Sequence, residues 1–275
     1  SGSGSLSILN GGAVSNLAGY ISGAGGGGAV TVSGVGSNGT ASTWTNAFEL
    51  YVGFDGAGAG TLSILNGGAV SSLGGYIGYN PGSQGTVTVS GVGSNGTAST
   101  WTNAGNLYVG YDGTGTLEIR NGGRVSNVVG NIGGGSNALI SGQGSSWQNS
   151  GQLVVGVYGT VGSTATLRAE GGATISSAYG VIGSDTRGDA VLTGAGTSWT
   201  NTGQFTVGSF GPGTLRIEDG ATVISNQGYI GANDTGTVTV TGAGSTWSMS
   251  PYSLTIGNIG TGSLTIENGG KVRAE

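Results

Sequence analysis

The sequence predicts an all-β fold, a parallel β-solenoid with three short strands per coil and about eleven coils. Three observations predict it. Seventeen residues at 39–55, GTASTWTNAFELYVGFD, recur at 96–112 with three changes, as stacked repeats do. Apolar residues such as Leu62 and Ile64 alternate with polar ones, which is the period of a half-buried strand. Many of the 65 glycines lie between these runs, where the chain must turn.

Two kinds of coil alternate along the chain. A leucine-type coil reads TLSILNGGAVSSLGGYIGYN, and the tryptophan-type coil after it reads TVTVSGVGSNGTASTWTNAGNLYVGYD. The leucine-type coils begin near Leu6, Leu62, Leu117, Leu167, Leu215 and Leu264, and the tryptophan-type coils near Val30, Val87, Ala138, Ala190 and Val238. We therefore expect residues 1–275 to form one continuous domain, a rod of roughly 50 Å at ~4.8 Å per coil.

The tryptophans are predicted to form a structural core column. Each occupies the slot that Val or Ile holds in the neighbouring coil, so large and small side chains alternate along the axis. The column comprises Trp44, Trp101, Trp147, Trp199 and Trp247. Two residues later lies a column of mostly Asn and Ser, such as Asn16 and Asn46, whose amides are expected to bond along the axis. A four-residue insertion, Asn95 to Ala98, predicts a small protruding loop, and its Asn-Gly-Thr sequon permits glycosylation.

Composition excludes several classes of function. The chain has no Cys and no His, so thiolate chemistry and the commonest general base and metal ligand are absent, and we expect no cofactor and no metal. The net charge of −5, with Lys and Arg scattered singly from Arg120 onward, argues against nucleic acid as a partner. No apolar run approaches the ~20 residues of a membrane span, so direct membrane insertion is not expected.

Several phrases together resemble the repeats in passenger domains of Gram-negative autotransporters, the type V secreted proteins. They are GTLEIRNGGRVSN at Gly115–Asn127, GYIGYNPGSQGTVTVSG at Gly75–Gly91 and GAGSTW at Gly242–Trp247. This resemblance implies a right-handed parallel β-helix at the cell surface, in a family that includes many adhesins, autoaggregation factors and biofilm proteins. It also implies a longer passenger, with a signal peptide and an outer-membrane barrel that residues 1–275 do not include.

A column of tyrosines is the first candidate contact surface. Tyr20, Tyr51, Tyr76 and Tyr108 stand one residue before inward Ile or Val in four consecutive coils, so they are expected to face outward. One interpretation is ring stacking between adjacent coils, worth about 0.5 to 1 kcal/mol per pair. The alternative is an open aromatic stripe that contacts sugars or a second copy of the rod.

The tripeptide Arg187-Gly188-Asp189 is the second candidate, because some adhesins use this sequence to engage integrins. We expect it in an exposed turn before the coil that begins near Ala190. Equivalent turns elsewhere carry a glycine flanked by uncharged residues, so ordinary surface variation is the alternative interpretation.

Charged side chains gather on the outward face of the first strand of each leucine-type coil from the third such coil onward. They are Glu118, Arg120, Arg168, Glu170, Arg216, Glu218 and Glu267. Acidic positions two coils, or ~9.5 Å, apart are compatible with the carboxylate spacing of an inverting glycosidase, roughly 6.5 to 9.5 Å. Because each Glu except the last has an Arg two residues away, solvated surface ion pairs are the favoured interpretation.

The sequence therefore favours a non-enzymatic adhesin or stalk segment of an autotransporter passenger. Its expected partners are itself, through contacts between cells, or a host, extracellular-matrix or glycan ligand. The alternative is a carbohydrate-active β-helix that acts on or binds polysaccharide.

Overall fold

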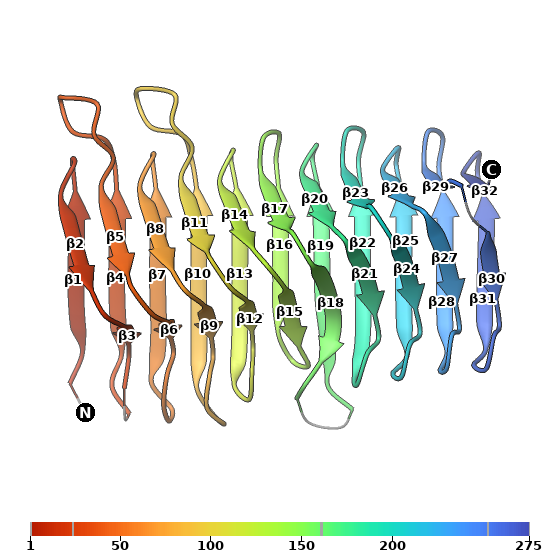
Figure 1. The fold of residues 1–275 in the computed structure, drawn as a ribbon, viewed down its shortest axis with the longest axis horizontal. Coiled ribbons are helices and arrows are strands. Elements are labelled where there is room, and N and C mark those ends of the chain that lie inside the picture. Colours follow the sequence, from red (N-terminus) through yellow and green to blue (C-terminus); the bar gives the residue numbers. More distant parts are fainter. Residues whose placement is uncertain (1, 24, 160–161, 252, 275) are drawn as a thin grey trace.

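The computed structural model describes residues 2–23, 25–159, 162–251 and 253–274, and in this part of the chain every regular element is a β-strand. The strands form three parallel sheets that run the length of a rod, with eleven, eleven and ten strands (Figure 1). The chain visits the three sheets in turn, so each coil adds one strand to each sheet. The predicted fold class, three strands per coil and about eleven coils are confirmed.

The strand bounds follow this order. The first sheet contains β1 (Gly4–Leu9), β4 (Gly28–Ser33), β7 (Ala59–Leu65), β10 (Gln84–Ser90), β13 (Thr114–Arg120), β16 (Asn137–Ser141), β19 (Thr164–Glu170), β22 (Arg187–Thr193), β25 (Gly213–Glu218), β28 (Gly236–Thr241) and β31 (Gly262–Glu267). The second contains β2 (Ala13–Asn16), β5 (Thr43–Asn46), β8 (Ala69–Ser72), β11 (Thr100–Asn103), β14 (Arg124–Asn127), β17 (Ser146–Asn149), β20 (Thr174–Ser177), β23 (Ser198–Asn201), β26 (Thr222–Ser225), β29 (Thr246–Met249) and β32 (Lys271–Ala274). The third contains β3 (Gly19–Ile21), β6 (Leu50–Val52), β9 (Gly75–Ile77), β12 (Leu107–Val109), β15 (Gly130–Gly133), β18 (Gln152–Val157), β21 (Tyr179–Ile182), β24 (Gln204–Val207), β27 (Gln227–Ile230) and β30 (Leu254–Ile256).

The first sheet shows why the apolar alternation produces these strands. Val87 pairs with Leu62 on one side and Leu117 on the other, and all three side chains are fully buried. The residues between the apolar positions face outward, as the period of two requires. A one-residue slip would expose the whole apolar column, so the hydrophobic pattern fixes the register.

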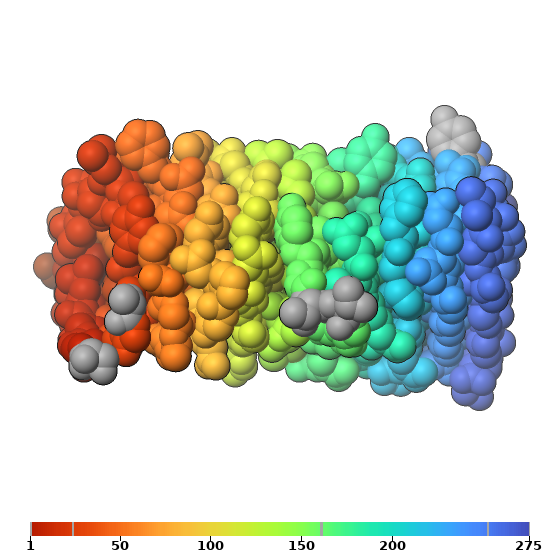
Figure 2. Space-filling model, turned by 90° about the horizontal axis from the view of Figure 1, so that it is seen from below, coloured from red at the N-terminus to blue at the C-terminus, as the bar shows by residue number. Residues whose placement is uncertain are grey.

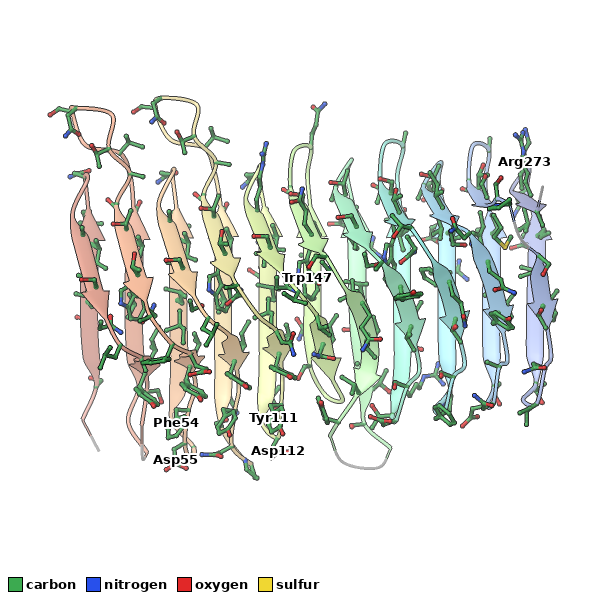
Figure 3. The ribbon with its side chains drawn as sticks, in the orientation of Figure 1. Phe54, Asp55, Tyr111, Asp112, Trp147 and Arg273 are labelled. Carbon is green, nitrogen blue, oxygen red and sulfur yellow. The ribbon has the colours of Figure 1, made fainter. Side chains whose placement is uncertain are left out.

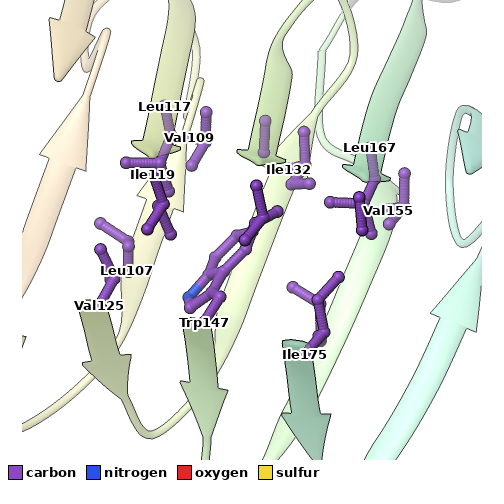
Figure 4. Packing of buried hydrophobic residues seen from close by; sticks show 14 of the residues in the cluster. Leu107, Val109, Leu117, Ile119, Val125, Ile132, Trp147, Val155, Leu167 and Ile175 are labelled. Atoms are coloured by element: carbon purple, nitrogen blue, oxygen red, sulfur yellow. The ribbon is translucent and has the colours of Figure 1, made fainter. Parts of the chain in front are cut away.

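The predicted tryptophan column lies in the second sheet. Trp101 pairs with Val70 and Val125, and Trp147 pairs with Val125 and Ile175, so large and small side chains alternate as expected (Figure 4). Four of the five indoles have no solvent exposure, and Trp44, in the second coil, is 5% exposed.

Room for four of the five indoles comes from glycines that the sequence interpretation did not single out. In one tryptophan-type coil, Leu107 is the first inward residue of the third strand. The leucine-type coil before it has Gly75 at the paired position. A Cβ atom at Gly75 would lie 2.6 Å from Cζ2 of Trp101 and 2.8 Å from Cδ1 of Leu107. The large residue of one coil therefore occupies the space left by a missing side chain in its neighbour.

The side chains of the polar column form hydrogen bonds along the axis, as predicted, and they also accept hydrogen bonds from the indole N–H groups. Asn16 Nδ2 donates to Asn46 Oδ1 at 2.7 Å. Each tryptophan Nε1 donates to the polar residue of the preceding coil: Trp44 to Asn16, Trp101 to Ser72, Trp147 to Asn127, Trp199 to Ser177 and Trp247 to Ser225, at 2.6 to 3.2 Å. The buried N–H thus keeps a partner, because an unpaired one would cost about 1 to 3 kcal/mol.

The two four-residue insertions form matching loops that protrude at one edge of the rod, between β4 and β5 and between β10 and β11 (Figure 1). Each is closed by an isolated antiparallel bridge, Val35 with Ala41 and Val92 with Ala98. The side-chain amide of Asn95 donates to the backbone oxygen of Gly39, so the two loops touch. The predicted protruding loop is confirmed.

Candidate functional site

In three strands of the first sheet, a glutamate and an arginine of the same strand form an ion pair. Glu118 binds Arg120, and the Arg168 and Glu170 side chains approach to 2.5 Å. Arg216 binds Glu218 at 2.8 Å. All these side chains are partly solvent-exposed, so each pair contributes on the order of 0 to 1 kcal/mol to stability. The solvated ion-pair interpretation of this face is confirmed for these three pairs.

The tripeptide Arg187-Gly188-Asp189 does not lie in a turn, and that prediction is wrong. These residues begin strand β22, where Gly188 pairs with Ala165 and Gly213 of the adjacent strands and is buried. Arg187 Nε and Asp189 Oδ1 face outward and form an ion pair at 3.1 Å. The two charged groups are therefore held on an extended strand, where each is the ion-pair partner of the other.

The tyrosine column faces outward from the third sheet, and its rings stack between adjacent coils. The ring centroids of Tyr20 and Tyr51 are 5.0 Å apart, those of Tyr51 and Tyr76 are 5.0 Å apart, and those of Tyr76 and Tyr108 are 4.9 Å apart. Neighbouring planes lie within 12° of parallel. We call this column the first row. Parallel in-register strands repeat each side chain at the coil spacing, which places the rings in stacking distance.

A second row of rings, which the sequence interpretation missed, lies beside the first. It consists of Phe54, Tyr79, Tyr111 and Tyr158, whose successive centroids are 5.0 to 5.6 Å apart. The first three follow the third strand by two residues, after a corner glycine such as Gly78, whose φ of 73° turns the chain there. The recurring phrases YVGFD, YIGYN and YVGYD carry the signal for this row.

The two rows interlock edge to face. The plane of Tyr76 is 83° from that of Tyr79, with centroids 5.0 Å apart, and Tyr51 meets both Phe54 and Tyr79 in the same way. Each such aromatic pair contributes about 0.5 to 1.5 kcal/mol beyond its buried area. We call the eight rings together the aromatic double ladder. Phe54 and Tyr111 lie along one long edge of the rod, next to Asp55 and Asp112 (Figure 3).

The double ladder perturbs its own hydroxyl groups. Burial against neighbouring rings, followed by the charges of Tyr108, Tyr51, Glu49 and Tyr79, raises the pKa of Tyr76 to about 12. Burial is also the main cause of the raised pKa of Tyr51, with Glu49 the second cause. The hydroxyl of Tyr108 accepts a hydrogen bond from Asn106 Nδ2 at 3.2 Å. The raised pKa keeps the phenols of Tyr51 and Tyr76 neutral over the physiological range.

Two recesses in the described part of the rod are lined by uncharged side chains and glycines. One of about 480 Å³ opens at the first coil, lined by Leu6, Tyr20, Trp44 and several glycines. Another of the same volume lies on the second sheet and is lined by amide, hydroxyl and small apolar side chains, including Asn103 and Gln148. Among the described residues, no three His, Cys, Asp or Glu side chains lie close enough together to hold a metal.

Comparison with known proteins gives little further information. No family model and no curated protein matches the chain. Among solved structures, the crystal structure of the TibC-catalyzed hyper-glycosylated TibA55-350 fragment matches over 98% of this chain and 99% of that chain, with 16% sequence identity and a TM-score of 0.26. At this TM-score the match carries no argument about the present chain. In the described part of the chain, no helix is long and apolar enough to cross a membrane.

Proposed function

We propose that this chain is a non-enzymatic segment of a cell-surface adhesin, an autotransporter passenger that associates with copies of itself on neighbouring cells. The observation that carries the proposal is the first sheet, in which eleven parallel strands present outward side chains, many of them Ser, Thr or charged, at one repeat per coil. A contact made in one coil can be made again in the next, so weak contacts add along the rod. The rod's elongated shape supports such lateral contact (Figure 2).

The charges of the first sheet support adhesion over hydrolysis. A glycosidase needs one carboxyl group held as an acid and a second held as a base or nucleophile around one bond. Here the carboxylates of Glu118, Glu170 and Glu218 each bind an arginine of their own strand. Polysaccharide cleavage remains the alternative function, and it is tested alongside.

The experiment is clustering of beads coated with the domain at fixed density, observed by microscopy. We expect clustering that free domain competes away, with bare beads as the control. A triple variant, Arg168→Ser with Arg187→Ser and Arg216→Ser, alters the outward surface of the first sheet and tests its role in clustering. The control variant Arg124→Ser alters an outward residue of the second sheet instead. Beads that stay dispersed, or that cluster despite saturating free domain, would contradict self-association. New reducing ends after incubation with acidic polysaccharides would favour the enzymatic alternative.

A further inference from the structure

Carboxylates accompany the aromatic double ladder, and the part of the chain that supplies seven of its eight rings contains no cation. Residues 1–119 contain Glu49, Asp55, Asp112 and Glu118 but no Lys and no Arg. Glu49 immediately precedes strand β6, which carries Tyr51, and Asp55 and Asp112 directly follow Phe54 and Tyr111. A ligand for this surface is therefore expected to be positively charged.

The shape of the ladder selects the form of that ligand. Within a row the rings cover each other's faces, so the outer surface is a ribbon of ring edges and hydroxyl groups along the rod axis. Aromatic rings bind an incoming ring favourably edge to face. Four rungs span three coil steps of ~4.8 Å, or roughly 14 Å, which suits a flat molecule of two or three linked rings. A sugar that needs a free ring face finds fewer of them here.

Glu49 lies beside the ladder and provides a partner for the positive charge. Gly74 immediately precedes β9, and a Cβ atom there would lie 3.8 Å from Glu49 Cγ and 3.9 Å from Tyr76 Cε2. The Glu49 stem and the Tyr76 ring therefore both pack against the backbone of Gly74, which is itself buried. A cation held by the Glu49 carboxylate would lie next to the Tyr76 ring.

We infer that the aromatic double ladder is a binding site for elongated, flat aromatic cations, which lie along the rod axis with their positive charge near Glu49. The site is independent of the proposed adhesive role, because it uses the third sheet and needs no second copy of the rod.

The test uses thioflavin T, a flat benzothiazolium cation, with wild-type protein that sedimentation shows to be monomeric. We expect saturable binding, measured by equilibrium dialysis and by the dye's fluorescence. Glu49→Gln keeps the size of the side chain and is expected to weaken binding about two- to five-fold at low salt, since the charge is partly exposed. Tyr76→Leu interrupts the first row, removes its edge-to-face contacts with Tyr79 and Tyr111, and is expected to weaken binding more than about ten-fold.

The matched control is Tyr229→Leu, which removes a tyrosine from the same outward column of the third sheet in a later coil, outside the ladder. Its dye binding should equal that of wild type. Absence of saturable binding to wild type would overturn the inference. So would equal binding by wild type, Glu49→Gln and Tyr76→Leu, because the dye would then bind elsewhere. Equally tight binding of Congo red, a long flat dianion, would overturn the assignment of charge. The result of this dye-binding test does not depend on whether beads coated with the domain cluster.

Discussion

Replacement of Gly75 by alanine tests the central packing rule of this rod. The added methyl group would lie 2.6 Å from Cζ2 of Trp101, about 1 Å closer than carbon atoms in contact normally approach. Trp101 is fully buried between Val70 and Val125, so the indole has no free space into which to shift. Overpacking of a closed core costs about 1 to 3 kcal/mol.

A second effect opposes part of that cost. Alanine restricts the unfolded chain more than glycine does, which stabilises the folded state by about 0.4 to 1 kcal/mol where the backbone tolerates it. We therefore expect Gly75→Ala to lower the free energy of unfolding by about 1 to 2 kcal/mol. The adjacent Gly74→Ala is the matched control, because its methyl group would meet no atom closer than 3.4 Å. Its stability should lie within about 0.5 kcal/mol of wild type.

The assay is unfolding in guanidinium chloride, followed by far-UV circular dichroism and by tryptophan fluorescence, since coincident curves establish a single transition. The double variant Gly75→Ala with Trp101→Leu then measures the coupling between the two sites. We expect the alanine to cost at least about 1 kcal/mol less when the indole is absent. A Gly75→Ala protein as stable as wild type, or a cost that Trp101→Leu leaves unchanged, would refute the paired exchange of large and missing side chains.

Three further outcomes follow from the same contacts. Ser72→Ala removes the acceptor of the Trp101 indole and should lower the free energy of unfolding by about 1 to 3 kcal/mol. The control Ser71→Ala changes an outward side chain of the same strand and should alter that free energy by less than about 0.5 kcal/mol. Equal effects of the two substitutions in denaturant melts would contradict the role of the hydrogen bond. Because the pKa of Tyr76 is raised from 10.0 to about 12, its unfolded form releases the proton first, so its contribution to stability is complete below pH 10 and disappears as pH rises to 12. Absorbance titration at high pH should show one phenol fewer ionising near pH 12 in Tyr76→Phe, and identical titrations would refute this assignment. Since Asp189 is paired on a strand, Asp189→Glu should leave the attachment of integrin-bearing cells unchanged, and a loss of attachment would contradict that expectation.

Local periodicity made the fold predictable, and features set by contacts between coils were less accessible. The alternation of Trp101 with Val70 and Val125 follows from comparing equivalent positions along the sequence. The same comparison in the third strand shows Gly75 paired with Leu107, which explains why the indole fits. In a glycine-rich chain, however, such a glycine is easily interpreted as a turn residue.

The candidate surfaces were predictable to different degrees. The outward column containing Tyr76 follows from the strand period, whereas its partner row follows a corner glycine, where no period of two operates. The turn expected at Arg187 was wrong because parallel pairing extends strand β22 back to that residue, beyond the apolar alternation that marks the strand in the sequence.

The rod carries different chemistry along its length on a single scaffold. Rings of the double ladder cover the third sheet from the first coil to the sixth, ending at Tyr158, while the ion pairs of the first sheet begin with Glu118 and Arg120 in the fifth coil. In a solenoid each coil contacts chiefly its neighbours, so an outward residue can change in one coil without a cost elsewhere. The inward residues have no such freedom, because every Val, Trp and Gly of the core column faces the coil above and the coil below. Core positions therefore recur with few changes, while surface positions vary from coil to coil.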